Sequence, residues 1–164
     1  VHIINTSLLT HTFPEAFKVA RVIPLFKGGT ALDLSNYRPI SLLSVISKFI
    51  EKWIKLQLYE FLEQNNLLSD KQFGFRRGVG VDEALFSITR DLHDVVDDGR
   101  KAILILLDMA KAFDCVNRAQ LLEVLRYSGI NGDEHKWFGS YFENRSQLVS
   151  VDGTNSSSRP VDYG

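Results

Sequence analysis

The chain has 164 residues, of which 45% are hydrophobic and 24% charged, a composition typical of a globular domain with enough apolar residues for a core. Its net charge of −1 by itself argues against a nucleic-acid binder, and its single cysteine, Cys115, cannot form an internal disulfide, which favours a reducing compartment. No apolar run reaches the roughly 20 residues of a membrane helix and the N-terminus has no signal-peptide pattern, so we expect an intracellular protein of the nucleus or cytoplasm that is not secreted.

The first half of the chain predicts a strand, a loop, a helix, a second loop and a second helix. β-Branched and apolar residues favour a strand over 19–26, and glycine and proline favour a loop over 27–41. Apolar residues at a period of 3.6 predict a helix over 45–62. The glycine-punctuated stretch 69–81 is a loop, and the helical period returns over 84–96 and ends at the next glycine.

The second half begins with residues 101–108, whose unbroken apolar character predicts a strand buried on both faces. A helix from about Asn117 ends at Gly129, and a further helix covers about 133–143. Residues 147–164 predict a strand, a turn and the start of another strand. Because strands alternate with helices, the fold class is α/β or α+β.

Four side chains of these helices carry further expectations. Trp53 and Trp137 lie on apolar helix faces, so both are expected in the core. Asp97 and Asp98 fall in the last turn of their helix, where the helix dipole disfavours acidic groups, and nothing in the local sequence explains them.

A carboxylate, Asp108, stands directly after the apolar run 103–107. Ligands of open α/β sheets gather where strands end, and an unpaired ionised aspartate in an apolar site is unfavourable unless a cation holds it. Mg²⁺ suits this position, because it takes one or two protein carboxylates and completes its shell with water and phosphates. The N–H groups of Lys111 and Ala112, in the following turn, can face an anion. Taken alone, a strand-terminal aspartate is more often a helix cap or a surface ion-pair partner, and Asp114 fits a structural role near a helix N-terminus.

Three blocks of sequence together are more specific than any single motif. They read FPEAFKVARVIPLFKGG with NYRPISLLSVISKFIEKWI, then LLSDKQFGFRRG, then LILLDMAKAFDCVN. In order and spacing they resemble the reverse transcriptases of non-long-terminal-repeat (LINE-type) retrotransposons, of the jockey-like kind, over about residues 8–164. The resemblance implies an α+β fold, the right-hand polymerase, truncated before its catalytic hairpin. Residues 1 to about 100 would be mostly fingers with palm helices, and about 101–164 a partial palm.

The resemblance also implies a two-magnesium site for nucleotidyl transfer. Asp108 would be the catalytic carboxylate that bridges both metals, and the carbonyl of Met109 would bind the metal that carries the triphosphate. Lys111 and Ala112 would offer backbone N–H groups to that triphosphate. Phe113 would clash with a ribose 2′-OH and so select deoxynucleotides, although the residue pattern alone favours a core position for this ring.

Basic residues elsewhere match the family's other ligand contacts. Lys27 and Arg38, on a glycine-containing loop, would clamp the triphosphate; without the resemblance they would read as solvated charges. Gln72, Gly74 and Arg76 would contact a single-stranded template. The implied partners are an RNA template, a DNA primer and a dNTP, with no membrane, and the oligomeric state is left open.

The same segments hold weaker candidates. Lys18 and Arg21 are candidates for template phosphates, because the basic residues of this region outnumber the acidic ones. Phe73 and Phe75 are expected to be packing residues.

The sequence departs from the family in the second half of the metal site. A Tyr-Ala-Asp-Asp hairpin is missing, and one aspartate cannot hold two Mg²⁺ ions in register. Since the sequence also has no initiating methionine, we expect a fragment of an RNA-directed DNA polymerase from a transposable element, without polymerase activity alone. A palm without this hairpin leaves the strand at 103–107 short of a neighbour, with an exposed apolar face that favours aggregation.

Two other readings remain. A decayed or domesticated reverse-transcriptase-derived protein would fold or bind nucleic acid without catalysis, and His11, where the family usually has glycine, is consistent with decay. An unrelated α/β phosphate-binding protein ranks last, because Gly28 and Gly29 have neither Walker nor GxGxxG spacing.

Overall fold

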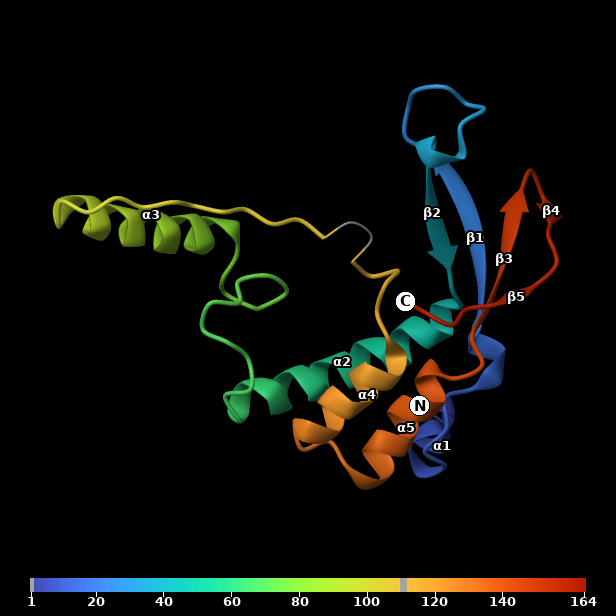
Figure 1. The fold of residues 1–164 in the computed structure, drawn as a ribbon. Helices are drawn as coiled ribbons and strands as arrows, with labels where there is room; N and C mark the ends of the chain where they lie inside the picture. Colours follow the sequence, from blue (N-terminus) through green and yellow to red (C-terminus); the bar gives the residue numbers. More distant parts are fainter. Residues whose placement is uncertain (1, 110–111) are drawn as a thin grey trace. The chain divides into compact units, whose positions relative to one another are not determined.

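The computed structural model describes residues 2–109 and 112–164, shown as a ribbon in Figure 1. The described chain divides into two compact units, the first made of residues 2–58 and 112–164 and the second of residues 59–109. Helices and a β-sheet occur together, so the α+β expectation is confirmed at this level. Among the described residues, no helix combines the length and apolar character needed to cross a bilayer.

A mixed sheet runs through the first unit (Figure 1). Its central strand β1 (Val19–Phe26) pairs antiparallel with β2 (Tyr37–Leu42) and parallel with β3 (Ser146–Val151). The short strands β4 (Thr154–Asn155) and β5 (Arg159–Pro160) both pair with β3. The predicted strand at 19–26 is therefore confirmed to the residue, and the predicted strands near the C-terminus are present.

The predicted loop at 27–41 is wrong in its last third, because residues 37–42 form β2 and close a hairpin with β1. Pro39 favours a loop by sequence, but β2 is an edge strand, where a residue without an N–H is tolerated. It lies opposite Pro24, which itself lies beyond the part of β1 that pairs with β3. Two prolines in register suit a non-hydrogen-bonded position of an antiparallel ladder.

The core of the first unit forms around Phe13, Ile50 and Trp137, all nearly inaccessible to solvent. Trp137 lies in α5 (Gly132–Phe142), and its indole N–H donates to the hydroxyl of Ser7 at 2.9 Å. Ser7 belongs to α1 (His2–Leu9), a helix that the sequence did not predict. The core position of Trp137 is confirmed.

The other expected core tryptophan, Trp53, is 41% exposed, so that prediction is wrong. Its helix, α2 (Val45–Gln64), is present as predicted. The apolar face of this helix carries more residues than the described core covers, and Trp53 is one of those left partly exposed. Helix α4 (Arg118–Tyr127) is present as predicted. It begins after Asn117, whose side chain accepts the Gln120 N–H at 3.1 Å and caps the helix.

The second unit contains α3 (Val81–Asp97), which ends in a Schellman motif. The N–H of Gly99, at φ +69°, donates to the Val96 carbonyl, and the N–H of Arg100 donates to the Val95 carbonyl. The Arg100 guanidinium also pairs with Asp98 at 2.6 Å. This pair supplies the partner for Asp98 that the local sequence did not reveal.

The predicted strand at 101–108 is wrong in this structure. Residues 101–109 have no regular secondary structure, and Ile103 and Leu107 are each 90% exposed. A strand exists only where a neighbour accepts and donates its backbone hydrogen bonds, and within the described residues no segment pairs with this one. The expectation of an exposed apolar face here is confirmed.

Candidate nucleotide and template site

The structure places the candidate metal ligands on the exposed segment that follows α3. Asp108 and Met109 both face solvent, Met109 with 75% of its surface exposed. Lys111, a candidate N–H donor, lies outside the described residues. The carboxylate of Asp108 and the carbonyl of Met109 are oxygen donors of the kind that Mg²⁺ prefers.

Two neighbouring oxygens fit a magnesium ion only in part. Within residues 2–109 and 112–164, no group of three or more histidine, cysteine, aspartate or glutamate side chains could hold a metal ion. Mg²⁺ keeps several waters and takes further ligands from substrate phosphates, so two protein oxygens can contribute to one shell. They do not fix two ions at the separation that two-metal transfer needs.

Ala112 and Phe113 lie in a turn over residues 112–115 of the first unit, and both are exposed. Phe113 is 73% exposed, so the alternative of a core position is wrong. The N–H of Gly164 donates to the Val116 carbonyl at 3.1 Å, and a Cβ on Gly164 would lie 3.2 Å from the Phe113 carbonyl oxygen. The C-terminal segment therefore packs directly on this turn.

One partly buried arginine fixes that contact. Arg118, at the start of α4, donates to the carbonyls of Phe142, Val161 and Gly164 at 3.0, 2.6 and 3.0 Å. Burial, followed by the nearby positive charge of Arg145, lowers the pKa of the Arg118 guanidinium. The end of α5 and the C-terminal segment thus meet on one side chain, which holds the turn that carries Phe113.

The hairpin brings Lys27 and Arg38 together at its loop end. Arg38 lies opposite Leu25 in the ladder, and Lys27 follows β1 directly, with its N–H donating to the Asn36 carbonyl at 2.9 Å. Both basic side chains are exposed. The β1–β2 hairpin therefore presents two cations near one turn, an arrangement that can bind an anion.

The hairpin loop between these cations has a defined shape. Gly29 adopts φ +93°, and a Cβ there would lie 2.8 Å from the Asn36 amide nitrogen, so only glycine fits. The Tyr37 hydroxyl donates to the Ala31 carbonyl at 2.9 Å. The Ser35 N–H donates to the Asp33 carboxylate and lowers its pKa. These contacts set the backbone from which Lys27 and Arg38 project.

Lys18, a weaker candidate of the first unit, lies in the interior of that unit. Lys18 is 2% exposed and its ammonium pairs with Glu15. The expectation that Lys18 faces template phosphates is therefore wrong, whereas Arg21 is exposed.

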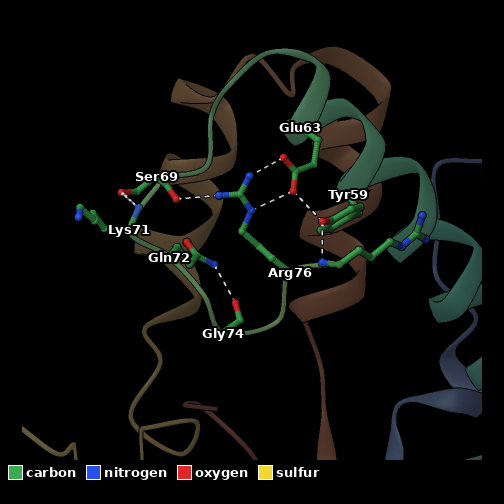
Figure 2. A network of polar contacts seen from close by, with 8 residues as sticks. Tyr59, Glu63, Ser69, Lys71, Gln72, Gly74 and Arg76 are labelled. Atoms are coloured by element: carbon green, nitrogen blue, oxygen red, sulfur yellow. Dashed lines mark hydrogen bonds and ion pairs between the residues drawn. The ribbon is translucent and has the colours of Figure 1, made fainter. Parts of the chain in front are cut away.

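In the second unit, the predicted template residues lie in a loop over residues 69–80, which we call the Arg76 loop (Figure 2). Arg76 donates to both carboxylate oxygens of Glu63, at 3.0 and 2.8 Å, and to the Ser69 carbonyl at 2.8 Å. The Tyr59 hydroxyl donates to the same carboxylate at 2.6 Å. Figure 2 shows this network between the last turns of α2 and the loop.

The network accounts for two opposite pKa shifts. Hydrogen bonds from Arg76 and Tyr59 lower the pKa of the Glu63 carboxyl, and the same bond with Glu63 raises the pKa of the Arg76 guanidinium. The Arg76 side chain is 18% exposed. Arg76 therefore organises the loop, and its contact with a template stays a prediction.

The other predicted template residues remain accessible. Gln72 is exposed, and its side-chain amide lies 3.4 Å from the carbonyl of Gly74 (Figure 2). Lys71 links the loop to α3 through Ser87 and Asp91, at 3.2 and 3.5 Å.

Sequence reasoning missed Arg77 and Tyr59. The Arg77 guanidinium is exposed and lies 5.0 Å from the centre of the Tyr59 ring, and its own N–H donates to the Tyr59 hydroxyl at 3.0 Å. A cation held over a ring keeps its charge available to an anion. The signal in the sequence was the spacing of Tyr59 and Glu63, one helical turn apart, before a loop with two adjacent arginines.

One aromatic residue of the loop also differs from its prediction. Phe75, expected to pack, is 85% exposed and adopts φ +62°, which is unusual for a side chain other than glycine or asparagine. Phe73 is partly buried, as expected.

Comparisons with known proteins identify relatives over the whole chain. Residues 27–162 match the family described as reverse transcriptase (RNA-dependent DNA polymerase). The chain is 31% identical to a probable RNA-directed DNA polymerase from transposon BS of Drosophila melanogaster, and 32% identical to the RNA-directed DNA polymerase from mobile element jockey of the same species. It is 30% identical to the corresponding jockey protein of Drosophila funebris. These similarities cover 99–100% of this chain and 18% of each relative, so the chain spans about a fifth of their length.

Proposed function

The chain belongs to the reverse transcriptase family, and from this premise we propose that it forms part of an RNA-directed DNA polymerase of a jockey-like non-LTR retrotransposon. The polymerase would join deoxynucleotides to a DNA primer along an RNA template. The match of residues 27–162 to the family carries this proposal. The candidate cations Lys27 and Arg38 and the carboxylate Asp108 support it, because they are exposed and follow one another along the chain in the order of the family's motifs.

Within this polymerase, Asp108 and the carbonyl of Met109 would hold magnesium, while Lys111 and Ala112 would donate N–H groups to the triphosphate. A bound magnesium ion would supply charge stabilisation for the attacking and leaving oxygens. Phe113 would stand against the sugar, where its exposed ring can exclude a 2′-OH. Arg118 would support this step indirectly, because it holds the C-terminal segment against the turn of Phe113.

The hairpin cations would act on the incoming nucleotide. Lys27 and Arg38 project from the same end of the β1–β2 hairpin, so both can reach one triphosphate. Arg38 can bind two phosphate oxygens through its planar guanidinium, and Lys27 adds a point charge. Together they would offset the charge that develops on the phosphates during transfer.

The Arg76 loop would face the template. Gln72 and Gly74 are exposed on it, and Arg76 would act chiefly through the loop shape that its pairing with Glu63 maintains. We extend this assignment to Arg77, whose exposed guanidinium on the Tyr59 ring can meet a template phosphate. In this assignment residues 1 to about 100 are mostly fingers, with palm helices, and about 101–164 belong to the palm.

An exchange experiment tests the proposal. Residues 27–162 replace the matching segment of the Drosophila melanogaster jockey polymerase, and template-dependent primer extension is measured. We expect the hybrid to extend primers and Asp108→Asn to reduce its rate by at least about 100-fold. Asp97→Asn, the same change at an exposed carboxylate of α3, is the control and should leave the rate near that of the hybrid. Equal activity of the two variants would overturn the role of Asp108.

A further inference from the structure

The turn that carries Phe113 rests on the backbone of Gly164. The Val116 N–H donates to the Phe113 carbonyl at 3.4 Å, and the Val116 carbonyl accepts the Gly164 N–H at 3.1 Å. A Cβ at Gly164 would lie 3.2 Å from the Phe113 carbonyl oxygen and 3.3 Å from the Cα of Asp114. The two segments therefore touch through their backbones, at a separation that a larger residue would increase.

Arg118 holds Gly164 in place through two of its nitrogen atoms. Its Nε donates to the Gly164 carbonyl at 3.0 Å, whereas its Nη1 donates to the carbonyls of Phe142 and Val161 at 3.0 and 2.6 Å. The guanidinium is planar, so these donors have a fixed geometry. Gly164 is thereby held relative to the end of α5, and the turn that packs on it is held with it.

Selection of a sugar by an aromatic ring depends on where the ring stands. A ring rejects a 2′-hydroxyl only if the two would overlap, so a ring that moves away loses the rejection. A displacement of about 1 Å, caused far from the reacting atoms, can change a rate by about 100-fold. Because Phe113 is 73% exposed, the position of its backbone largely decides where its ring stands.

We propose that Arg118 and Gly164 are positioning residues that set the preference of this polymerase for deoxynucleotides over ribonucleotides, by holding the turn of Phe113. The inference rests on the proposed function, in which the Phe113 ring excludes the 2′-OH. Arg118 donates to backbone carbonyls, so it acts through the turn and not by contact with the sugar. Its loss should relax the choice of sugar and largely preserve the use of deoxynucleotides.

A conservative change at Arg118 tests this role. Residues 1–164 replace the matching segment of the Drosophila melanogaster jockey polymerase, which aligns with 99% of this chain, and kcat/KM is measured for dCTP and CTP. Arg118→Lys keeps the charge, but its single nitrogen cannot replace both Nε and Nη1. We expect the dCTP preference to fall about tenfold and kcat/KM for dCTP to stay within about threefold. Arg126→Lys is the control, since Arg126 pairs with Glu123 on the same helix, and should leave the preference unchanged.

Two glycines form a second matched pair. Gly164 and Gly153 both have left-handed backbones, at φ +88° and +80°, so alanine strains both alike. A Cβ at Gly164 meets the turn of Phe113, whereas nothing lies within 4 Å of a Cβ at Gly153. We expect Gly164→Ala to lower the dCTP preference about tenfold and Gly153→Ala to leave it unchanged.

The variant Phe113→Ala separates this inference from the proposed function. It removes the ring, and we expect the dCTP preference to fall by at least about 100-fold. An unchanged preference would show that Phe113 does not select the sugar, and both its proposed role and the inference would fail. A preference that falls in Phe113→Ala, but not in Arg118→Lys or Gly164→Ala, would overturn the inference alone.

Cys115 reports the turn without catalysis. It is the only cysteine of the chain and lies exposed in the turn over residues 112–115. A nitroxide attached to it in the 164-residue chain should gain mobility in Arg118→Lys and Gly164→Ala, but not in Arg126→Lys or Gly153→Ala, as measured by electron paramagnetic resonance. Circular dichroism checks that each variant is folded. Equal mobility in all of these proteins would overturn the inference, even for a hybrid that does not extend primers.

Discussion

At the scale of single residues, Glu63 is the side chain that holds the Arg76 loop to the end of α2. It accepts hydrogen bonds from both the Arg76 guanidinium and the Tyr59 hydroxyl. Tyr59 in turn accepts the Arg77 N–H and lies under its guanidinium. One carboxylate therefore connects the two arginines of the loop, one by direct pairing and the other through a phenol.

This arrangement predicts a loss of loop order in acid. The pKa of Glu63 is lowered by its hydrogen bonds from Arg76 and Tyr59. A carboxyl with a lowered folded-state pKa stabilises its surroundings above its unfolded pKa and loses that contribution as the pH falls through the folded value. Amide-exchange protection in residues 69–80, corrected for intrinsic rates, should therefore be constant near neutral pH and fall below about pH 4.3.

The variant Glu63→Gln removes the titrating group and keeps its shape. It should show reduced protection of the Arg76 loop at neutral pH and little further change in acid. Glu60→Gln, at an exposed position of the same helix, is the control and should respond like the unchanged chain. An acid response that survives in Glu63→Gln would assign the effect to another group.

The residue scale also marks where sequence reasoning ends. The cations beside aromatic rings in QFGFRRG identified the loop and the candidate Arg76, because the motif fixes residue type. The motif gave Arg77 no role and did not predict that Arg76 pairs with Glu63, since that pairing depends on which arginine reaches Glu63 across 13 residues of chain. Such a choice is made by tertiary geometry and not by spacing in the sequence.

At the scale of elements, the termination of α3 depends on a backbone conformation that suits glycine. Gly99 adopts φ +69° and its N–H and that of Arg100 close the Schellman motif. Gly139 is the contrasting case, because it lies inside α5 with open space where a Cβ would stand.

These two glycines predict opposite responses to alanine. Gly99→Ala should destabilise the end of α3 by about 1 kcal/mol, because a Cβ disfavours the left-handed region. Gly139→Ala should stabilise α5 by about 0.5–1 kcal/mol, because alanine restricts the unfolded backbone. Hydrogen exchange of the amides at the end of each helix measures both changes. A gain in protection at the end of α3 would contradict the role of Gly99.

Helices and strands differed in how far they could be predicted. The helical period in 45–64 and 81–97 depends on residues three and four apart, so α2 and α3 could be read locally. A strand depends on partners distant in sequence. Residues 37–42 form an edge strand because they pair with β1. Residues 101–108 form no strand because no described segment pairs with them. Helix α1 was missed because its place is set by Ser7 and Trp137, which are 130 residues apart.

At the scale of the whole molecule, the described chain presents the candidate ligands without completing a metal site. Asp108 and Met109 supply two oxygens, and the described residues contain no cluster of three metal-binding side chains. The basic residues Lys27 and Arg38 of the hairpin and Arg77 of the Arg76 loop are exposed.

The 164-residue chain alone should show no polymerase activity. With primer, RNA template, dNTPs and Mg²⁺, we expect incorporation no higher than in a protein-free reaction, because two metals cannot be held in register. The complete jockey polymerase is the positive control for the substrates. Template-dependent extension by the purified chain, abolished in Asp108→Asn, would contradict this expectation.

The unequal burial of the two tryptophans gives the first unit an optical signal of its own. Trp137 is 4% exposed and stacks on Tyr141 at 5.5 Å, whereas Trp53 is 41% exposed. An indole that leaves an apolar core for water emits at longer wavelength, so a red shift during denaturation would come mainly from Trp137. In a Trp53→Phe background the fluorescence spectrum would follow the packing of the core around Trp137, which joins α1, α2 and α5.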